Sequence, residues 1–228
     1  MCPRVWRLLP MLAIPLMAAD PTWKTKDVTQ WTKADAQEVL DSSPWVQRAE
    51  VTVLPQRSEA QMRGAGRMGM TKGTGLEALE PSILTGVGGG NRLVKKPPTR
   101  QTLPVRWESA SLIRSAELKT GDGRAPAWDG EYYVVAVYDV PGLEDQRMLP
   151  VELKRGAFLK RSGKKNLKPA RVDLLFEEKG ATVVFLFPRT DEITTQDGRI
   201  WFVAQFGPLF VEQIFNVPEM QFHGKIEL

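Results

Sequence analysis

The sequence predicts a mainly β protein of the α+β type, built as a β-sandwich or a partly open barrel with an N-terminal helix and one or two further short helices. Two observations predict this fold class. Short segments rich in β-branched and aromatic residues recur through the second half of the chain, separated by turn-forming residues. The 228-residue chain is 42% hydrophobic and 25% charged, so its composition is globular and supports one substantial domain.

Six strands are expected after residue 130. They span residues 132–140, 171–176, 182–187, 200–206, 210–215 and 222–228. Lys179-Gly180 and Gly207-Pro208 are typical of hairpin turns, and Asp197-Gly198 marks another turn. Residues 200–206 are apolar on both alternating faces, which predicts a central strand.

The first expected helix covers residues 32–42. Thr32 and Asp35 have the spacing of a capping box, and apolar residues follow at helical spacing. Ser43-Pro44 ends the helix, because a residue that precedes proline avoids the α conformation. A short strand is expected next, at residues 49–54.

A second helix is expected to begin at Ser109 and to run to about Leu118. The hydroxyl of Ser109 is suited to capping the first turn, and Gly121 is suited to the left-handed conformation that ends many helices. Residues 149–160 fit either a helix or a strand.

The chain divides into four segments. Residues 1–19 are expected to be a signal peptide, because Arg4 and Arg7 precede a run of 12 apolar residues that ends in small residues. That run is too short to span a membrane, and no transmembrane segment is expected after cleavage. The other segments are an N-terminal helical segment at 20–55, a Gly-rich flexible linker or loop at 56–102, and a β-rich domain at 103–228.

Composition excludes several kinds of chemistry. One cysteine and one histidine rule out a disulfide framework, a Cys/His zinc site and a Cys–His nucleophile pair. Residues 64–69 match G-x-G-x-x-G but lack the preceding strand and following helix of a dinucleotide site. His223 has no G-x-S-x-G nucleophile to serve, so an ordinary strand histidine is expected. The sequence predicts no metal and no cofactor.

A basic segment is the candidate binding site. Residues 147–171 contain nine lysines and arginines and one acid, whereas residues 172–228 contain four basic and nine acidic residues. This polarity predicts an anionic partner, namely phospholipid headgroups, lipopolysaccharide or an acidic protein face, although a solvated loop has the same pattern. Nucleic acid is not expected, because only Phe158 lies among the charges. The candidate residues are Lys160, Arg161, Lys164, Lys165 and Lys168.

Two further groups of residues leave alternatives open. Three acid pairs could act as the carboxylates of a glycosidase if they met in a cleft: Asp129 with Glu131, Glu144 with Asp145, and Asp191 with Glu192. Five aromatic residues could either line a groove or fill the core: Trp107, Trp128, Tyr132, Tyr133 and Trp201.

Both ends of the chain carry motifs of a recognisable kind. They are W-T-K-A-D-A with S-P-W at residues 31–45, F-P-R-T with I-T at 187–194, and F-N-V-P-E-M with G-K-I-E-L at 215–228. In these motifs the chain resembles a family of uncharacterised exported proteins of soil bacteria. The resemblance implies export and a shared fold, and it brings no catalytic residue.

The sequence therefore favours an exported protein, periplasmic or extracellular, that acts as a non-enzymatic interaction or envelope-associated binding module. The alternative is a carboxylate-based hydrolase that acts on envelope glycans. A convergent carboxylate pair in a deep pocket would favour the hydrolase, and a flat basic face would favour the binding module.

Overall fold

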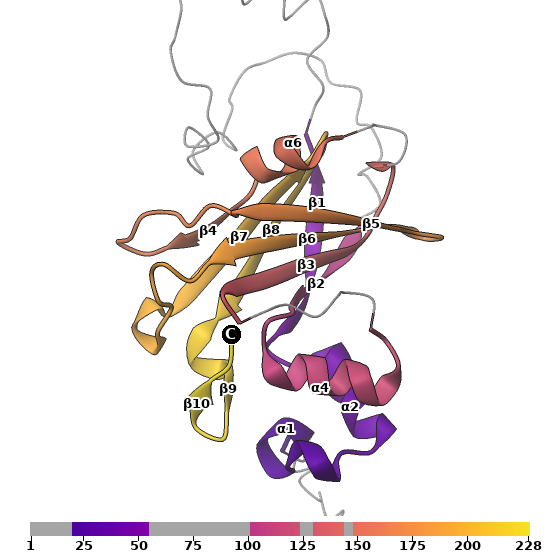
Figure 1. Ribbon diagram of the computed structural model, residues 1–228, viewed down its shortest axis with the longest axis vertical. Coiled ribbons are helices and arrows are strands. Elements are labelled where there is room, and N and C mark those ends of the chain that lie inside the picture. Colours follow the sequence, from indigo (N-terminus) through magenta and orange to yellow (C-terminus); the bar gives the residue numbers. More distant parts are fainter. Residues whose placement is uncertain (1–19, 55–100, 124–129, 144–147) are drawn as a thin grey trace, which may run out of the picture.

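The computed structural model describes residues 20–54, 101–123, 130–143 and 148–228, and its main feature is one antiparallel sheet of eight strands (Figure 1). The strand order is β4-β7-β8-β1-β2-β3-β6-β5, and the sheet curls into a half-barrel. This confirms the predicted fold class. The strands are β1 (Val46–Val53), β2 (Thr102–Trp107), β3 (Tyr132–Val140), β4 (Phe158–Arg161), β5 (Arg171–Glu177), β6 (Gly180–Pro188), β7 (Arg199–Phe206) and β8 (Leu209–Asn216).

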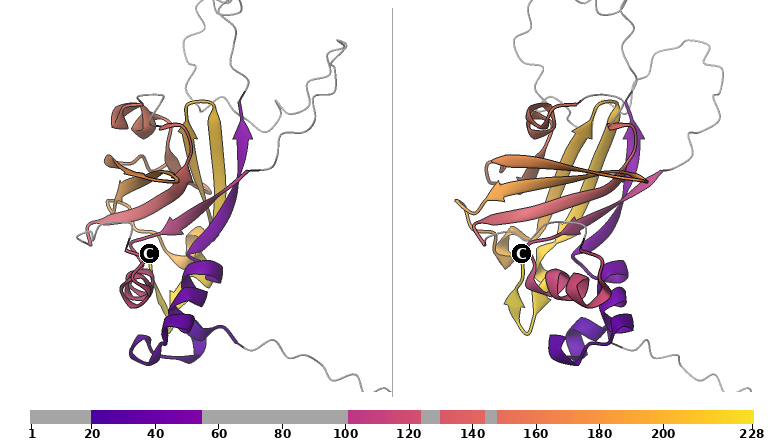
Figure 2. Two further views of the ribbon diagram at one scale, coloured as in Figure 1. Left: turned by 90° about the vertical axis from the view of Figure 1, so that its right-hand side faces the viewer. Right: turned by 45° about the vertical axis from the view of Figure 1, so that its right-hand side comes forward.

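Helices occupy the two ends of the half-barrel. Figures 1 and 2 show α1, α2 and α4 gathered beyond one end of the sheet and α6 at the opposite end. The helices are α1 (Thr22–Thr25), α2 (Lys33–Ser42), α4 (Ser111–Thr120) and α6 (Pro150–Arg155), with the 3-10 turns η1 (Val28–Gln30), η4 (Thr195–Asp197) and η5 (Val217–Glu219). None of the helices in the described residues is long and apolar enough to cross a membrane.

The core lies inside the curl of the sheet. Alternate residues of every long strand point inward, and large aromatic side chains fill the interior. The Phe185 ring on β6 lies 5.4 Å from the Phe202 ring on β7, and the Trp107 ring on β2 lies 5.2 Å from the Phe215 ring on β8. β6 and β7 are not neighbours in the sheet, so the first contact crosses the interior.

Residues 46–53 belong to this sheet. β1 pairs with β2 along residues 46–50 and with β8 along residues 51–53, and thus occupies a central position. It starts three residues before the predicted strand. The buried Trp45 ring nitrogen donates a hydrogen bond to the Glu227 carbonyl 2.6 Å away, which joins the two ends of the described chain.

The predicted helix at 32–42 is confirmed. The Thr32 hydroxyl accepts a hydrogen bond from the Asp35 N–H at 3.2 Å, and the Asp35 carboxylate accepts one from the Thr32 N–H at 2.8 Å. A hydrogen bond from Lys26, followed by those from Thr32, lowers the pKa of Asp35. The first helix is therefore capped by the residues that the spacing indicated.

Strand β2 was not predicted, because Pro104 lies in its middle. The β2–β3 register covers only residues 105–107, so the N–H that Pro104 lacks would point beyond the paired part of β3. Leu103, Val105 and Trp107 alternate into the core on one side. Of the predicted linker, only Gln101 and Thr102 are described, and Thr102 begins this strand.

The second helix begins later than predicted. Its N-cap is Ala110, because the Ser109 hydroxyl instead accepts a hydrogen bond from the Val134 N–H of β3. The Glu227 carboxylate takes the place of an N-cap side chain, because it accepts hydrogen bonds from the N–H and the hydroxyl of Ser111 in the first turn of the helix. Gly121 ends the helix at φ +80°, as predicted.

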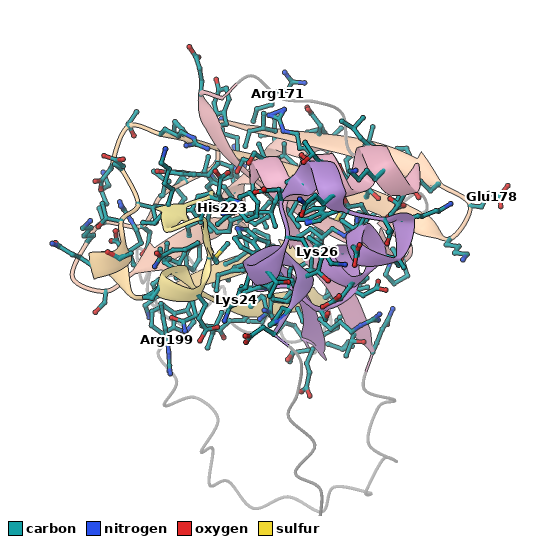
Figure 3. The ribbon with its side chains drawn as sticks, turned by 90° about the horizontal axis from the view of Figure 1, so that it is seen from below. Lys24, Lys26, Arg171, Glu178, Arg199 and His223 are labelled. Atoms are coloured by element: carbon teal, nitrogen blue, oxygen red, sulfur yellow. The ribbon has the colours of Figure 1, made fainter. Side chains whose placement is uncertain are left out.

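Two further predicted segments differ from the structure in detail. Residues 149–160 contain both alternatives in succession, first α6 and then β4. The predicted final strand at 222–228 is wrong: it is a small hairpin of β9 (Gln221–Phe222) and β10 (Lys225–Ile226). His223 and Gly224 form its turn at φ +49° and +75°, which interrupts any single strand. His223 lies 3.0 Å from the Asp27 carboxylate rather than on a strand (Figure 3).

The hairpin turn at residues 207–208 matches the prediction, and the one predicted at 179–180 lies one residue earlier, at 178–179. Strand β7 pairs with β4 and β8, so it is internal to the sheet, one position from the edge. The expected signal peptide at 1–19, most of the Gly-rich segment at 56–102 and the G-x-G-x-x-G motif lie outside the described residues.

Candidate functional site

The five basic residues predicted as a site lie on edge strand β4 and on the connection from β4 to β5. We call residues 160–168 the basic loop. The loop folds back on itself, because Leu159 and Leu167 exchange two backbone hydrogen bonds of 2.9 Å. All five candidates therefore lie close together at one edge of the half-barrel, but they do not point the same way.

Two of the five cations face protein groups. The Arg161 side chain is almost fully buried and pairs with the Asp191 carboxylate, and this hydrogen bond holds the pKa of Asp191 below its ordinary value. The Lys164 ammonium lies 2.9 Å from the buried Asp197 carboxylate. Burial opposes ionisation of Asp197, but hydrogen bonds from Thr194 and Lys164 outweigh it and lower its pKa. Arg161 and Lys164 thus hold the loop in place.

The other three cations are exposed to solvent, and we call Lys160, Lys165 and Lys168 the outer lysines. In the described part of the chain, the side-chain ammonium groups of Lys160 and Lys165 have no hydrogen-bond or ion-pair partner. The Lys168 ammonium lies 4.7 Å from the centre of the Phe158 ring. These three positive charges are consequently available to a ligand.

The sequence-predicted aromatic residues divide between core and surface. Trp107 and Tyr133 are buried in the core, whereas Tyr132 and Trp201 are half-buried on the outer face of the sheet. Trp201 on β7 is the cross-strand partner of Lys160 on β4. Trp128 lies outside the described residues.

None of the predicted acid pairs forms a described carboxylate pair. Asp129, Glu144 and Asp145 lie outside the described residues, and Asp191 pairs with Arg161 while its neighbour Glu192 is exposed. A different pair, Glu108 with Glu117, meets beneath helix α4. Sequence reasoning missed it because the two acids lie nine residues apart on different elements.

The Glu108–Glu117 pair is part of a buried polar cluster. The Tyr138 hydroxyl donates a hydrogen bond to Glu108, and Glu117 donates one to Glu108 when it is protonated. One Arg106 nitrogen lies 3.5 Å from Glu117 and the other lies 3.0 Å from Asp122. The Arg106 guanidinium also lies over the Tyr138 ring, 4.9 Å from its centre.

Burial changes the acidity of the cluster. It raises the pKa of Glu108, and, together with the negative charge of Glu108, it raises the pKa of Glu117 to about 8. Burial likewise raises the pKa of the Tyr138 hydroxyl. Two carboxyl groups that share one proton beside one arginine leave little uncompensated charge beneath the helix.

A carboxyl pair with a shared proton has the groups of an acid–base catalyst, but here the pair is enclosed. Glu108 is 2% exposed and Glu117 is 6% exposed, and every partner named above belongs to the protein. Neither residue lines the two clefts described next. The cluster joins α4 to the sheet, and of the residues named in it only Asp122 lines one of these clefts.

Two surface clefts lie elsewhere. One, of about 740 Å³, is lined by α1, the corner between α2 and β1, and residues 218–221, and it contains Lys24 and Arg48 as well as Asp41 and Glu219. The other, of about 550 Å³, is lined by Asp122, Asp139 and residues 177–179. The first contains two cations and two acids.

No group of three or more metal-binding side chains is present in the described residues. Comparison with known proteins gives no match to a family model, to a curated protein or to a solved structure.

The raised pKa of Glu117 predicts that the protein becomes less stable as pH rises. The unfolded chain releases this proton near pH 4.5, whereas the folded protein retains it until about pH 8. We therefore expect the free energy of unfolding to fall by about 3.5 kcal/mol between pH 5 and pH 8, as measured by urea unfolding. Glu117→Gln should remove most of this fall, because an uncharged amide can still donate to Glu108.

Glu178→Gln is the matched control, since Glu178 projects into solvent at the far edge of the sheet (Figure 3). It should keep the wild-type pH dependence. An unchanged pH dependence in Glu117→Gln would show that this carboxyl does not titrate with a raised pKa.

Arg161 should be needed for folding rather than for contact with a ligand. Arg161→Gln removes a buried side chain and its ion pair, so we expect thermal unfolding several degrees below that of the wild type. Lys165→Gln, in the same loop but exposed, should unfold at the wild-type temperature. Equal unfolding temperatures in the two variants would contradict the assignment of Arg161 as the anchor of the loop.

Proposed function

We propose that this chain is an exported protein that binds an anionic component of the cell envelope through the outer lysines, without catalysing a reaction. One observation carries the proposal: the basic loop uses two cations to fix its own conformation and leaves three others exposed to solvent. A loop that only needed to be soluble would not require internal anchors. A fixed loop presents its charges in one arrangement, which lowers the entropy that binding costs.

Export rests on the N-terminal residues. Arg4 and Arg7, the apolar run that follows them and the small residues at 16–19 have the order of a secretory signal. A single cysteine at position 2 leaves the expected mature chain without any, so its folding does not depend on the redox state of its compartment.

We favour binding over the alternative, a carboxylate-based hydrolase that acts on envelope glycans. Such an enzyme would use Glu108 and Glu117, the described carboxyl pair, and a glycan would have to reach both. Both carboxyls are almost fully buried and already bonded to Arg106 or Tyr138, so a glycan could reach them only if these contacts opened. The basic loop requires no rearrangement to meet an anionic ligand.

Location is the first test. We expect the mature protein in the periplasmic or secreted fraction of its native host, with an N-terminus near Ala19 or Asp20 by mass spectrometry. An intact Met1 in the cytoplasmic fraction would contradict export.

Replacement of the outer lysines is the second test. Lys160→Gln, Lys165→Gln and Lys168→Gln combined should weaken binding to dextran sulfate, a soluble polyanion, by about 100-fold, since each lysine contributes about 1 kcal/mol to such attraction. The readout is the dissociation constant at low and at physiological salt.

The matched control replaces three exposed lysines elsewhere, Lys33, Lys179 and Lys225, with glutamine. It removes the same net charge, so it should bind nearly as well as the wild type if position matters. If both triple variants lose the same affinity, binding follows net charge alone and the assignment to the basic loop is wrong.

A further inference from the structure

Helix α6 places exposed aliphatic side chains beside the basic loop. Leu149 and Val151 are 62% and 56% exposed, whereas Leu153 is fully buried and fixes which side of the helix faces the protein. Val151, Lys154 and Arg155 stand at positions i, i+3 and i+4, so they share the outward face. One face of this helix is therefore both apolar and cationic.

The helix is joined to the start of β5, where the basic loop ends. The Lys154 ammonium donates a hydrogen bond of 2.5 Å to the Ala170 carbonyl, two residues beyond Lys168. Helix α6 contacts β5 and β7, and Figure 1 shows it across the end of the half-barrel. The aliphatic residues and the outer lysines thus belong to one region of the surface.

The charge of this region is one-sided. Residues 148–171 contain eight lysines and arginines and a single acid, Glu152. The Glu152 carboxylate accepts a hydrogen bond from the Leu149 N–H and so caps the helix. Arg155, like Lys160 and Lys165, has no ion-pair partner in the described residues. An occupant of this surface must therefore carry many negative charges and also accept aliphatic side chains.

We propose that α6 and the outer lysines form a surface that binds an anionic lipid bilayer, an inference that rests on the proposed function and specifies its ligand. The lysines and Arg155 contact headgroups, while Leu149 and Val151 enter the boundary between headgroups and acyl chains. This pairing of aliphatic and cationic side chains is typical of proteins that lie on a membrane.

An anionic polysaccharide fits this surface less well. Sugars stack on exposed aromatic faces, but Lys168 covers the Phe158 ring and Trp201 is half-buried. Aliphatic side chains offer sugars no such plane, and a soluble polyanion would leave Leu149 and Val151 in water. Lipid is the anionic partner that buries them.

The test is flotation with vesicles made of equal parts phosphatidylcholine and phosphatidylglycerol, with pure phosphatidylcholine vesicles as the neutral control. We expect the mature chain, which starts at Asp20, to bind the anionic vesicles only. Leu149→Ser combined with Val151→Ser should weaken this binding at least about tenfold, because two aliphatic contacts are lost. The same variant should bind dextran sulfate as the wild type does, because its charges are intact.

The matched control is Leu118→Ser combined with Phe176→Ser, which removes two exposed apolar side chains from α4 and from the far end of β5. It should bind vesicles as the wild type does. All four residues are exposed, and an unchanged thermal unfolding temperature verifies that each variant is folded.

The outcomes separate this inference from the proposed function. Wild-type binding to dextran sulfate without binding to anionic vesicles overturns the lipid inference and leaves the proposed function standing, as does an unaffected Leu149/Val151 variant. An acidic envelope protein captured without any vesicle binding also overturns it. Failure of the wild type to bind either probe overturns both.

Discussion

The structure depends on the contact that aromatic rings of β6 and β7 make across the interior of the sheet. These strands stand far apart in the strand order, so the rings meet only if the sheet curls. The connection between β4 and β5 imposes the same constraint. In a flat sheet the two edges would be about 34 Å apart, at about 4.8 Å per strand. Nine residues that also fold back on themselves cannot span that distance.

Curling therefore brings the two edges toward each other and gives the basic loop its position. The loop passes between the edge strands, and α6 lies across the adjacent end of the half-barrel. The two ion pairs of the loop reach Asp191, just after β6, and Asp197, just before β7. Cations and apolar residues from separate elements gather there because the sheet closes, a consequence of core packing and not of local sequence.

The sequence was sufficient where the signal was local. The capping box of Thr32, the αL position of Gly121 and the hairpin turn at residues 207–208 depend on neighbouring residues, and each prediction is confirmed. Prediction was wrong where a distant group decided the outcome. Glu227 caps α4 across 116 residues, which frees Ser109 to bond to β3.

The sequence predicted which residues make up the candidate site, but not the role of each side chain. Charge density located the basic loop, but it could not separate Arg161 and Lys164 from the outer lysines, because their acidic partners lie in another loop. The buried Glu108–Glu117 cluster could have been suspected from one feature of the sequence. Glu117 stands four residues after Ile113, on the apolar face of its helix, and an acid there needs a partner. Which partner it has depends on the pairing of β2 with β3.

The central place of β1 determines the order in which this chain can fold. β1 belongs to the first part of the chain, but its pairing with β8 joins residue 51 to residue 211. During synthesis the ribosome must release almost the whole chain before this strand acquires its second neighbour, so contacts of long range make folding slow. A chain that folds slowly stays unfolded for longer and can pass through a narrow channel during that time. For a protein that we propose to be exported, late closure of the sheet is what a translocation channel requires of its cargo.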